Sequence, residues 1–61
     1  MKTITVPDTS ITITVTNADE MFTIFNRLHP LMDLRVDNTT YPASTTHGYT
    51  LGYFEAVYFK N

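Results

Sequence analysis

The period of the hydrophobic pattern changes twice along this chain, and that change most constrains what it can fold into. Between residues 2 and 15, apolar β-branched residues alternate with threonine, as in a strand with one buried face. Residues 17–29 switch to helical spacing. Residues 49–59 lose the alternation because apolar residues occupy both odd-numbered and even-numbered positions. The chain is therefore expected to combine strands with at least one helix.

Two strands are predicted in the first sixteen residues, over 2–6 and 11–16. The apolar residues on one face are Ile4, Val6, Ile11, Ile13 and Val15, and the threonines on the other are Thr3, Thr5, Thr12, Thr14 and Thr16. Pro7 and Asp8 between the strands favour a turn, because proline presets φ and the aspartate side chain can bond nearby amides. We expect a hairpin.

A helix over about residues 18–29 follows the hairpin. Asn17 is the expected N-cap, with Glu20 placed for the return bond of a capping box and Asp19 complementing the positive end of the helix dipole. The apolar stripe contains Met21, Phe22, Ile24, Phe25 and Leu28. Arg27 and His29 occupy the last turn, and Pro30 disfavours further helix.

The second half of the chain is expected to form a second hairpin. Residues 31–37 predict a third strand with Leu34 and Val36 inward, although its first residues could be only a connection. Residues 38–48 are polar and predict a long loop, or a loop with a short edge strand around 39–41. Residues 49–59 are interpreted as a long final strand in which Gly52 is a candidate bulge.

These elements predict a single α+β domain spanning residues 1–61: two β-hairpins flanking one helix (ββαββ), with a four-stranded, mostly antiparallel sheet and the helix on one face. The order of elements is similar to that of the small immunoglobulin-binding bacterial domains and other β-grasp proteins. A chain of this size buries only about 60% of its unfolded surface. Because it has no cysteine, we expect it to gain stability by self-association.

Charge argues against nucleic acid as a partner. The net charge is −2, and the formal cations are Lys2, Arg27, Arg35 and Lys60, too few to neutralise a run of phosphates. The six acidic residues are too scattered to imitate a phosphate backbone. No apolar block has the length of a signal peptide or a membrane span, so we expect a cytoplasmic protein without membrane contact.

Catalytic constellations are weak. Ser44 and His47 could pair as nucleophile and base, with Asp37 or Asp33 orienting the imidazole, but no nucleophile elbow or glycine-rich oxyanion loop accompanies them. The chain has two glycines and no cysteine, which excludes a phosphate-binding loop and leaves no metal-ligand pattern. We expect no enzyme activity, no cofactor, no metal and no catalytic residue.

The surplus of aromatic residues near the C-terminus is the strongest functional indication. One sheet face cannot bury both parities of residues 49–59, so one set is expected on the open face, where exposed aromatic residues mark interfaces. The predicted interface residues are Tyr49, Tyr53, Phe54, Tyr58 and Tyr41. The alternative is that the extra rings only fill a thin core.

The expected function is that of a small non-catalytic protein–protein interaction module. Short proteins without catalytic residues are common among phage and mobile-element proteins that bind host enzymes, so we expect an inhibitor or modulator that binds a host protein through an aromatic sheet or edge surface, as a homo-oligomer. One alternative is a single-stranded nucleic-acid-binding sheet with stacking Tyr and Phe. Another is a ligand-binding or enzyme subunit whose site, with Tyr41, Ser44 and His47, forms at an oligomer interface.

Overall fold

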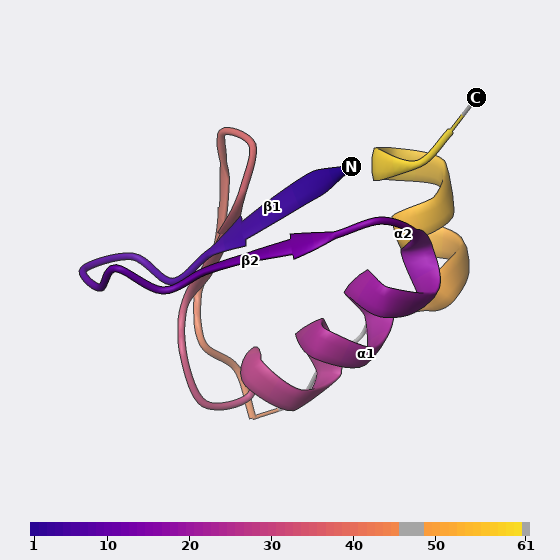
Figure 1. Ribbon diagram of the computed structural model, residues 1–61. Coiled ribbons are helices and arrows are strands. Elements are labelled where there is room, and N and C mark those ends of the chain that lie inside the picture. Colours follow the sequence, from indigo (N-terminus) through magenta and orange to yellow (C-terminus); the bar gives the residue numbers. More distant parts are fainter. Residues whose placement is uncertain (46–48, 61) are drawn as a thin grey trace.

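The computed structural model describes residues 1–45 and 49–60 of the chain. In order, its elements are β1 (Lys2–Thr5), β2 (Thr12–Val15), α1 (Ala18–Leu28), β3 (Leu34–Val36), β4 (Thr39–Tyr41) and α2 (Leu51–Tyr58) (Figure 1). The predicted α+β class, the ββαββ order and the four-stranded antiparallel sheet are confirmed. A second helix, α2, follows them.

The sheet has the order β2-β1-β3-β4, and every neighbouring pair is antiparallel. The two hairpins therefore meet through β1 and β3, with Thr5 opposite Arg35. Residues that are paired across the strands share a face of the sheet. The face that points away from the helices carries Thr3, Thr5, Thr12, Thr14, Arg35 and Thr40. We call this set the open face.

A two-residue turn joins β3 to β4, since Val36 is paired with Thr39. Asp37 takes the first turn position with φ 55°, a left-handed conformation that aspartate tolerates better than most residues. Its carboxylate accepts a hydrogen bond from Lys2 Nζ at 3.2 Å, which links the turn to β1. Both side chains are partly exposed, so the ion pair itself adds little stability.

The start of α1 confirms Asn17 as the N-cap. Asn17 Oδ1 accepts the Glu20 N–H at 2.9 Å. The predicted return bond from the Glu20 carboxylate to Asn17 is not formed. The carboxylate instead accepts the N–H and the hydroxyl of Thr16 at 2.7 and 2.8 Å. Both bonds lower the pKa of Glu20, and the bond from the Thr16 backbone N–H has the larger effect. The capping carboxylate thereby also ties the end of β2 to α1.

The interpretation of residues 49–59 as a strand with a bulge at Gly52 is wrong, because Leu51–Tyr58 is a helix. Thr50 is its N-cap and accepts the Tyr53 N–H at 3.2 Å. Leu51, Phe54 and Tyr58 lie at i, i+3 and i+7, so one side of the helix collects them. Apolar residues at both odd-numbered and even-numbered positions are compatible with a helix as well as with a strand.

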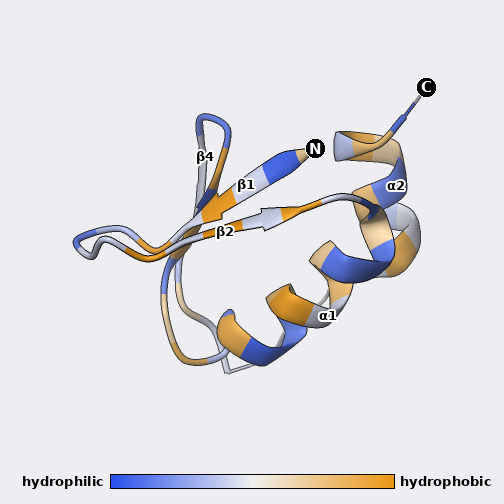
Figure 2. Ribbon diagram, in the orientation of Figure 1, coloured by the Kyte–Doolittle hydropathy of each residue, from blue (hydrophilic) through white to orange (hydrophobic). Residues whose placement is uncertain are grey.

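Both helices cover one face of the sheet, with α2 packed beside α1 (Figure 1). Apolar and polar residues alternate along β1 and β2 (Figure 2), and the buried ones among them are apolar. The buried residues of the core are Ile4, Val6, Val15, Ala18, Met21, Phe25, Leu34, Val36, Tyr41 and Phe54. The predicted inward positions of Leu34 and Val36 are confirmed, whereas Ile11 is 49% exposed because the tip of the first hairpin extends past the core.

Truncating Phe25 should remove the central contact of this core. Its side chain is 1% exposed and its ring lies 5.0 Å from that of Phe54, so Phe25→Ala should cost about 3–5 kcal/mol. That loss is comparable with the whole stability of so small a domain. Chemical denaturation should show a largely unfolded variant, while Thr23→Ala on the exposed side of α1 should unfold near the parent midpoint.

The second helix makes the stability of the chain sensitive to its cap. Thr50→Ala should lower the free energy of unfolding by about 0.5–2 kcal/mol, because the Tyr53 N–H loses the Thr50 hydroxyl and keeps only the Thr50 C=O, at 3.1 Å, as an acceptor. Urea denaturation followed by circular dichroism measures the change. An unchanged midpoint would contradict the helical assignment of α2, and Thr50→Ser, which keeps the hydroxyl, should restore most of the stability.

Candidate functional site

The five predicted interface residues lie together, but between α1, α2 and β4 rather than on the open face. Their rings form one aromatic cluster with Phe22, Phe25 and His29. Within it the ring centroids of Tyr41 and Tyr49 are 5.3 Å apart, and those of Tyr49 and Tyr53 are 5.1 Å apart. Edge-to-face geometries dominate, as is usual for packed rings.

The expected exposed position of Phe54 is wrong, since its side chain is fully buried, and Tyr41 is buried as well. Tyr49, Tyr53 and Tyr58 are half-buried and pack against the core. Because the last segment is a helix, it turns its rings toward α1 instead of distributing them over two sheet faces. The aromatic surplus therefore serves the core, and contact of the half-buried tyrosines with a partner stays a prediction.

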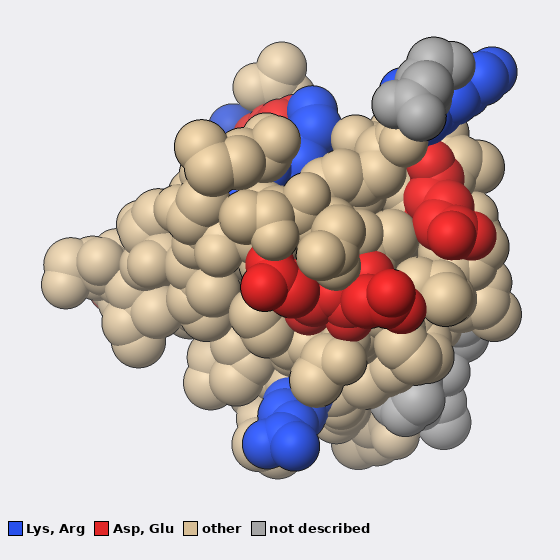
Figure 3. All heavy atoms as spheres, turned by 45° about the vertical axis from the view of Figure 1, so that its right-hand side comes forward, with Lys and Arg blue, Asp and Glu red and all other residues tan. Residues whose placement is uncertain are grey.

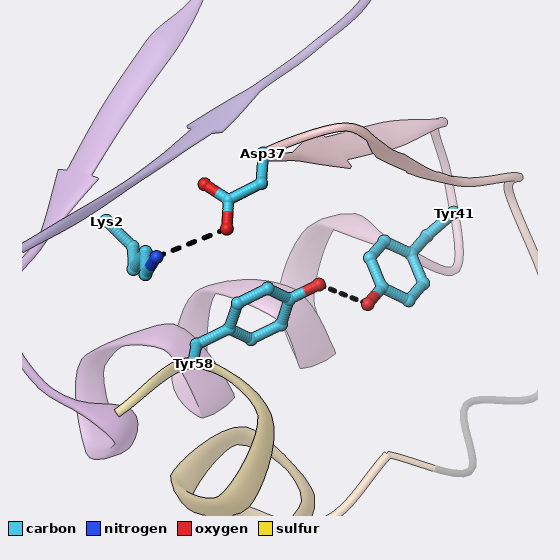
Figure 4. Close-up of polar contacts among 4 residues, drawn as sticks. All are labelled: Lys2, Asp37, Tyr41 and Tyr58. Atoms are coloured by element: carbon cyan, nitrogen blue, oxygen red, sulfur yellow. Dashed lines mark hydrogen bonds and ion pairs between the residues drawn. The ribbon is translucent and has the colours of Figure 1, made fainter. Parts of the chain in front are cut away.

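Three tyrosine hydroxyls meet at the border of the cluster. The Tyr41 hydroxyl from β4 shares a hydrogen bond with the Tyr53 hydroxyl at 3.0 Å. It shares another with the Tyr58 hydroxyl (Figure 4), and both partners lie on α2. Each phenol thus buries its ring while its polar tip finds a partner. This hydroxyl chain links the edge of the sheet to the second helix.

The environment of the hydroxyl chain favours the neutral phenols. Burial raises the pKa of Tyr41 to about 12, and the hydrogen bond to Tyr41 raises the pKa of Tyr53 to about 12. Burial also raises the pKa of Tyr58. A phenolate is disfavoured here because burial would deprive its charge of solvation.

The segment after β4 is bound to the end of α1. His29 C=O accepts the Ser44 N–H at 3.0 Å, and Asp33 Oδ1 accepts the Ala43 N–H at 2.6 Å. The His29 ring is buried among aromatic rings, and its Nδ1 has no hydrogen-bond partner among the described residues. The alternative of an edge strand around 39–41 is confirmed by β4 and its pairing with β3, while residues 46–48 of the predicted loop lie outside the described part.

The residues considered for catalysis are not assembled in the described structure. Asp37 pairs with Lys2, and Asp33 holds the Ala43 amide, so both candidate orienting carboxylates have other partners. His47 lies outside the described residues. Over residues 1–45 and 49–60, no three His, Asp or Glu side chains come together as a metal-binding group.

The open face carries a shallow hollow of about 530 Å³. Its lining residues are Met1, Lys2, Thr3, Thr5, Arg35 and Asp37. Two threonines of β1 line it together with two charged strand residues, Lys2 and Arg35. The hollow lies open to solvent and its lining is mostly polar, whereas small-molecule sites are usually enclosed and mostly apolar, so it fits a contact surface better than a small-molecule site.

The outer edge of β2 presents unpaired main-chain groups. The Val6 N–H donates to Ile11 C=O at 3.1 Å, which assigns Ile11, Ile13 and Val15 to the hydrogen-bonded positions facing β1. By the alternation of an antiparallel ladder, the N–H and C=O groups of Thr12 and Thr14 point outward. The outward N–H of Thr16 is already bound by Glu20.

Apolar side chains adjoin this edge on the helix side. Ile13 is half-buried and Ile11 is 49% exposed, and a hollow of about 350 Å³ separates Thr14 from Ile24 on α1. Acidic side chains gather over the start of α1 beside the hollow (Figure 3), where Asp19 and Glu20 line it. The combination of free main-chain groups, the exposed Ile11 and the half-buried Ile13 makes the edge of β2 the candidate interaction site.

Sequence reasoning missed this edge, although a signal for it was present. Residues 9–18 contain no formal charge, and proline is absent after Pro7 until Pro30. Charge and proline are the usual means of protecting an edge strand. The missing information was the sheet order, which places β2 at an edge.

No family model, curated protein or solved structure matches this chain. None of the helices in the described part of the chain is long and apolar enough to cross a membrane.

The hydroxyl chain should make folding sensitive to alkali. Because the folded-state pKa values of Tyr41 and Tyr53 are raised to about 12, their contribution to stability is complete below about pH 10, the ordinary tyrosine pKa, and is lost as the pH rises toward 12. Denaturation midpoints measured across this range should fall. Tyr41→Phe should flatten the fall and lower the pKa of Tyr53 in an ultraviolet titration, whereas an unchanged titration would contradict the contact.

Proposed function

We propose that this protein is a small, non-catalytic protein–protein interaction module of the cytoplasm, which binds another protein through the edge and the open face of its sheet and blocks or modulates it. The observation that supports this proposal is the unguarded edge of β2. A role as a phage or mobile-element inhibitor belongs to the same proposal and rests on analogy with other short, non-catalytic proteins.

Natural sheets rarely leave such an edge free. Edges are commonly protected by charged side chains, proline, bulges or covering segments, and an edge without them is a template for another strand. Addition of a strand is an established mode of peptide recognition, in which main-chain bonds supply affinity. The opposite edge, β4, has three residues and is linked to α2 through Tyr41, so it is the less accessible of the two.

The open face adds a flat contact area beside this edge. Its threonines are short and uncharged, so contact with a partner would desolvate little charge. The strands are spaced about 4.8 Å apart, two of them about 13 Å and two about 10 Å long, and together they cover about 220 Å². A standard interface needs about 800 Å² from each partner, so the face is expected to act together with the edge or with a second copy.

The alternatives have less support. For nucleic acid, stacking rings should lie on an accessible face, but the strand residues of the open face include no aromatic residue, and Lys2 is paired with Asp37. For a ligand-binding or enzyme subunit, Tyr41 should reach an interface, yet it is buried in the aromatic cluster. No specific contact in the described structure favours either function.

The proposal can be tested by capture of a partner from a lysate of the source cells, using tagged protein and matched variants. Thr5→Glu should strongly reduce recovery of the captured protein because it introduces a charge on the open face. Thr14→Pro should do the same because it removes an outward N–H at the edge. Ala56→Glu on the exposed side of α2 is the control and should retain the captured protein. Recovery that is insensitive to both sheet variants would refute the proposal, provided circular dichroism shows all variants folded.

A further inference from the structure

We propose that the strand added to the edge of β2 is β2 of a second copy, in a twofold-symmetric homodimer with one continuous eight-stranded sheet. The inference deepens the proposed function, because it rests on the same edge. Within the proposed function, the edge then joins the two copies, and the partner protein contacts the open face, doubled in width, instead of the edge.

The free main-chain groups select one register. Thr12 and Thr14 flank Ile13, so a twofold axis at Ile13 pairs Thr12 with Thr14 of the second copy and Thr14 with Thr12 of the second copy. The two pairs exchange four hydrogen bonds and use every outward group of these threonines. An axis at Thr14 would instead require Thr16, whose N–H is held by Glu20.

The side chains fit this register on both faces. On the helix side, Ile13 meets its own copy in a non-hydrogen-bonded pair, where side chains approach most closely. Ile11, which is 49% exposed, comes opposite Val15 of the second copy. On the open face, Thr12 and Thr14 form cross-strand threonine pairs, which are favourable neighbours in sheets.

Charge favours a second copy as the occupant. A strand that pairs with itself about a twofold axis places like charges near each other, and residues 9–18 carry none. The axis also sets α1 antiparallel to its copy. The acidic first turn of one helix, with Asp19 and Glu20, then points toward the end that carries Arg27 in the other.

Self-association can be measured on the intact chain and on two proline variants. Light scattering and analytical ultracentrifugation should give the parent twice the 7.0 kDa mass of one chain. Thr14→Pro should raise the dimer dissociation constant at least about tenfold, because two of the four hydrogen bonds are lost. Thr40→Pro is the matched control, because the alternation of the ladder also points the Thr40 N–H outward, on the opposite edge. It should leave the dimer intact.

A cysteine variant tests the register independently of any effect of proline on folding. The chain has no cysteine, so Ile13→Cys introduces the single thiol of each copy. Across a non-hydrogen-bonded pair the Cα atoms lie about 4.5 Å apart, within disulfide range. Oxidised glutathione should therefore convert folded Ile13→Cys into a covalent dimer, while Thr40→Cys should stay monomeric in a denaturing gel.

The outcomes separate this inference from the proposed function. A monomeric parent across the micromolar range, or a dimer that survives Thr14→Pro and gives no Ile13→Cys cross-link, would overturn the homodimer. If the captured protein is still lost with Thr14→Pro in that case, the edge binds a different chain and the proposed function stands. A dimer that dissociates with Thr14→Pro and cross-links through Ile13→Cys supports the inference whatever the lysate yields.

Discussion

The contact between Phe25 of α1 and Phe54 of α2 is the interaction on which the rest of this structure depends. The ring centroids are 5.0 Å apart and both side chains are buried. A helix of eight residues has little stability of its own, so α2 is helical because this contact docks it. The docking brings Tyr53 and Tyr58 within reach of Tyr41, which fastens the β4 edge of the sheet.

The same packing decides which surfaces are available to partners. With the aromatic rings turned inward, the open face presents threonines and Arg35, and the edge of β2 presents main-chain groups beside isoleucines. A small domain with one helical layer buries a limited part of its surface, so strand addition at β2 would extend the core as well as create an interface. Stability and binding are thereby coupled in the proposed dimer.

Local patterns predicted much of the fold. The alternation of isoleucine and valine with threonine identified the first hairpin, and Asn17 with the stripe through Phe25 identified α1. These assignments were accessible because strand period and helix capping depend on residues close in sequence. The five predicted interface residues were also correctly expected to lie together, but the sequence did not predict that their rings turn toward the core.

The sequence by itself determined β1, β2, α1 and β3, the α+β class and the absence of charge along β2. Only the tertiary structure decided that residues 51–58 are helical, because apolar residues in both parities suit either conformation until Phe54 is buried against Phe25. It also decided the strand order, which makes β2 an edge. Pairing between distant strands depends on which face of the sheet the helices cover, so the order of the strands cannot be predicted from patterns of residues close in sequence.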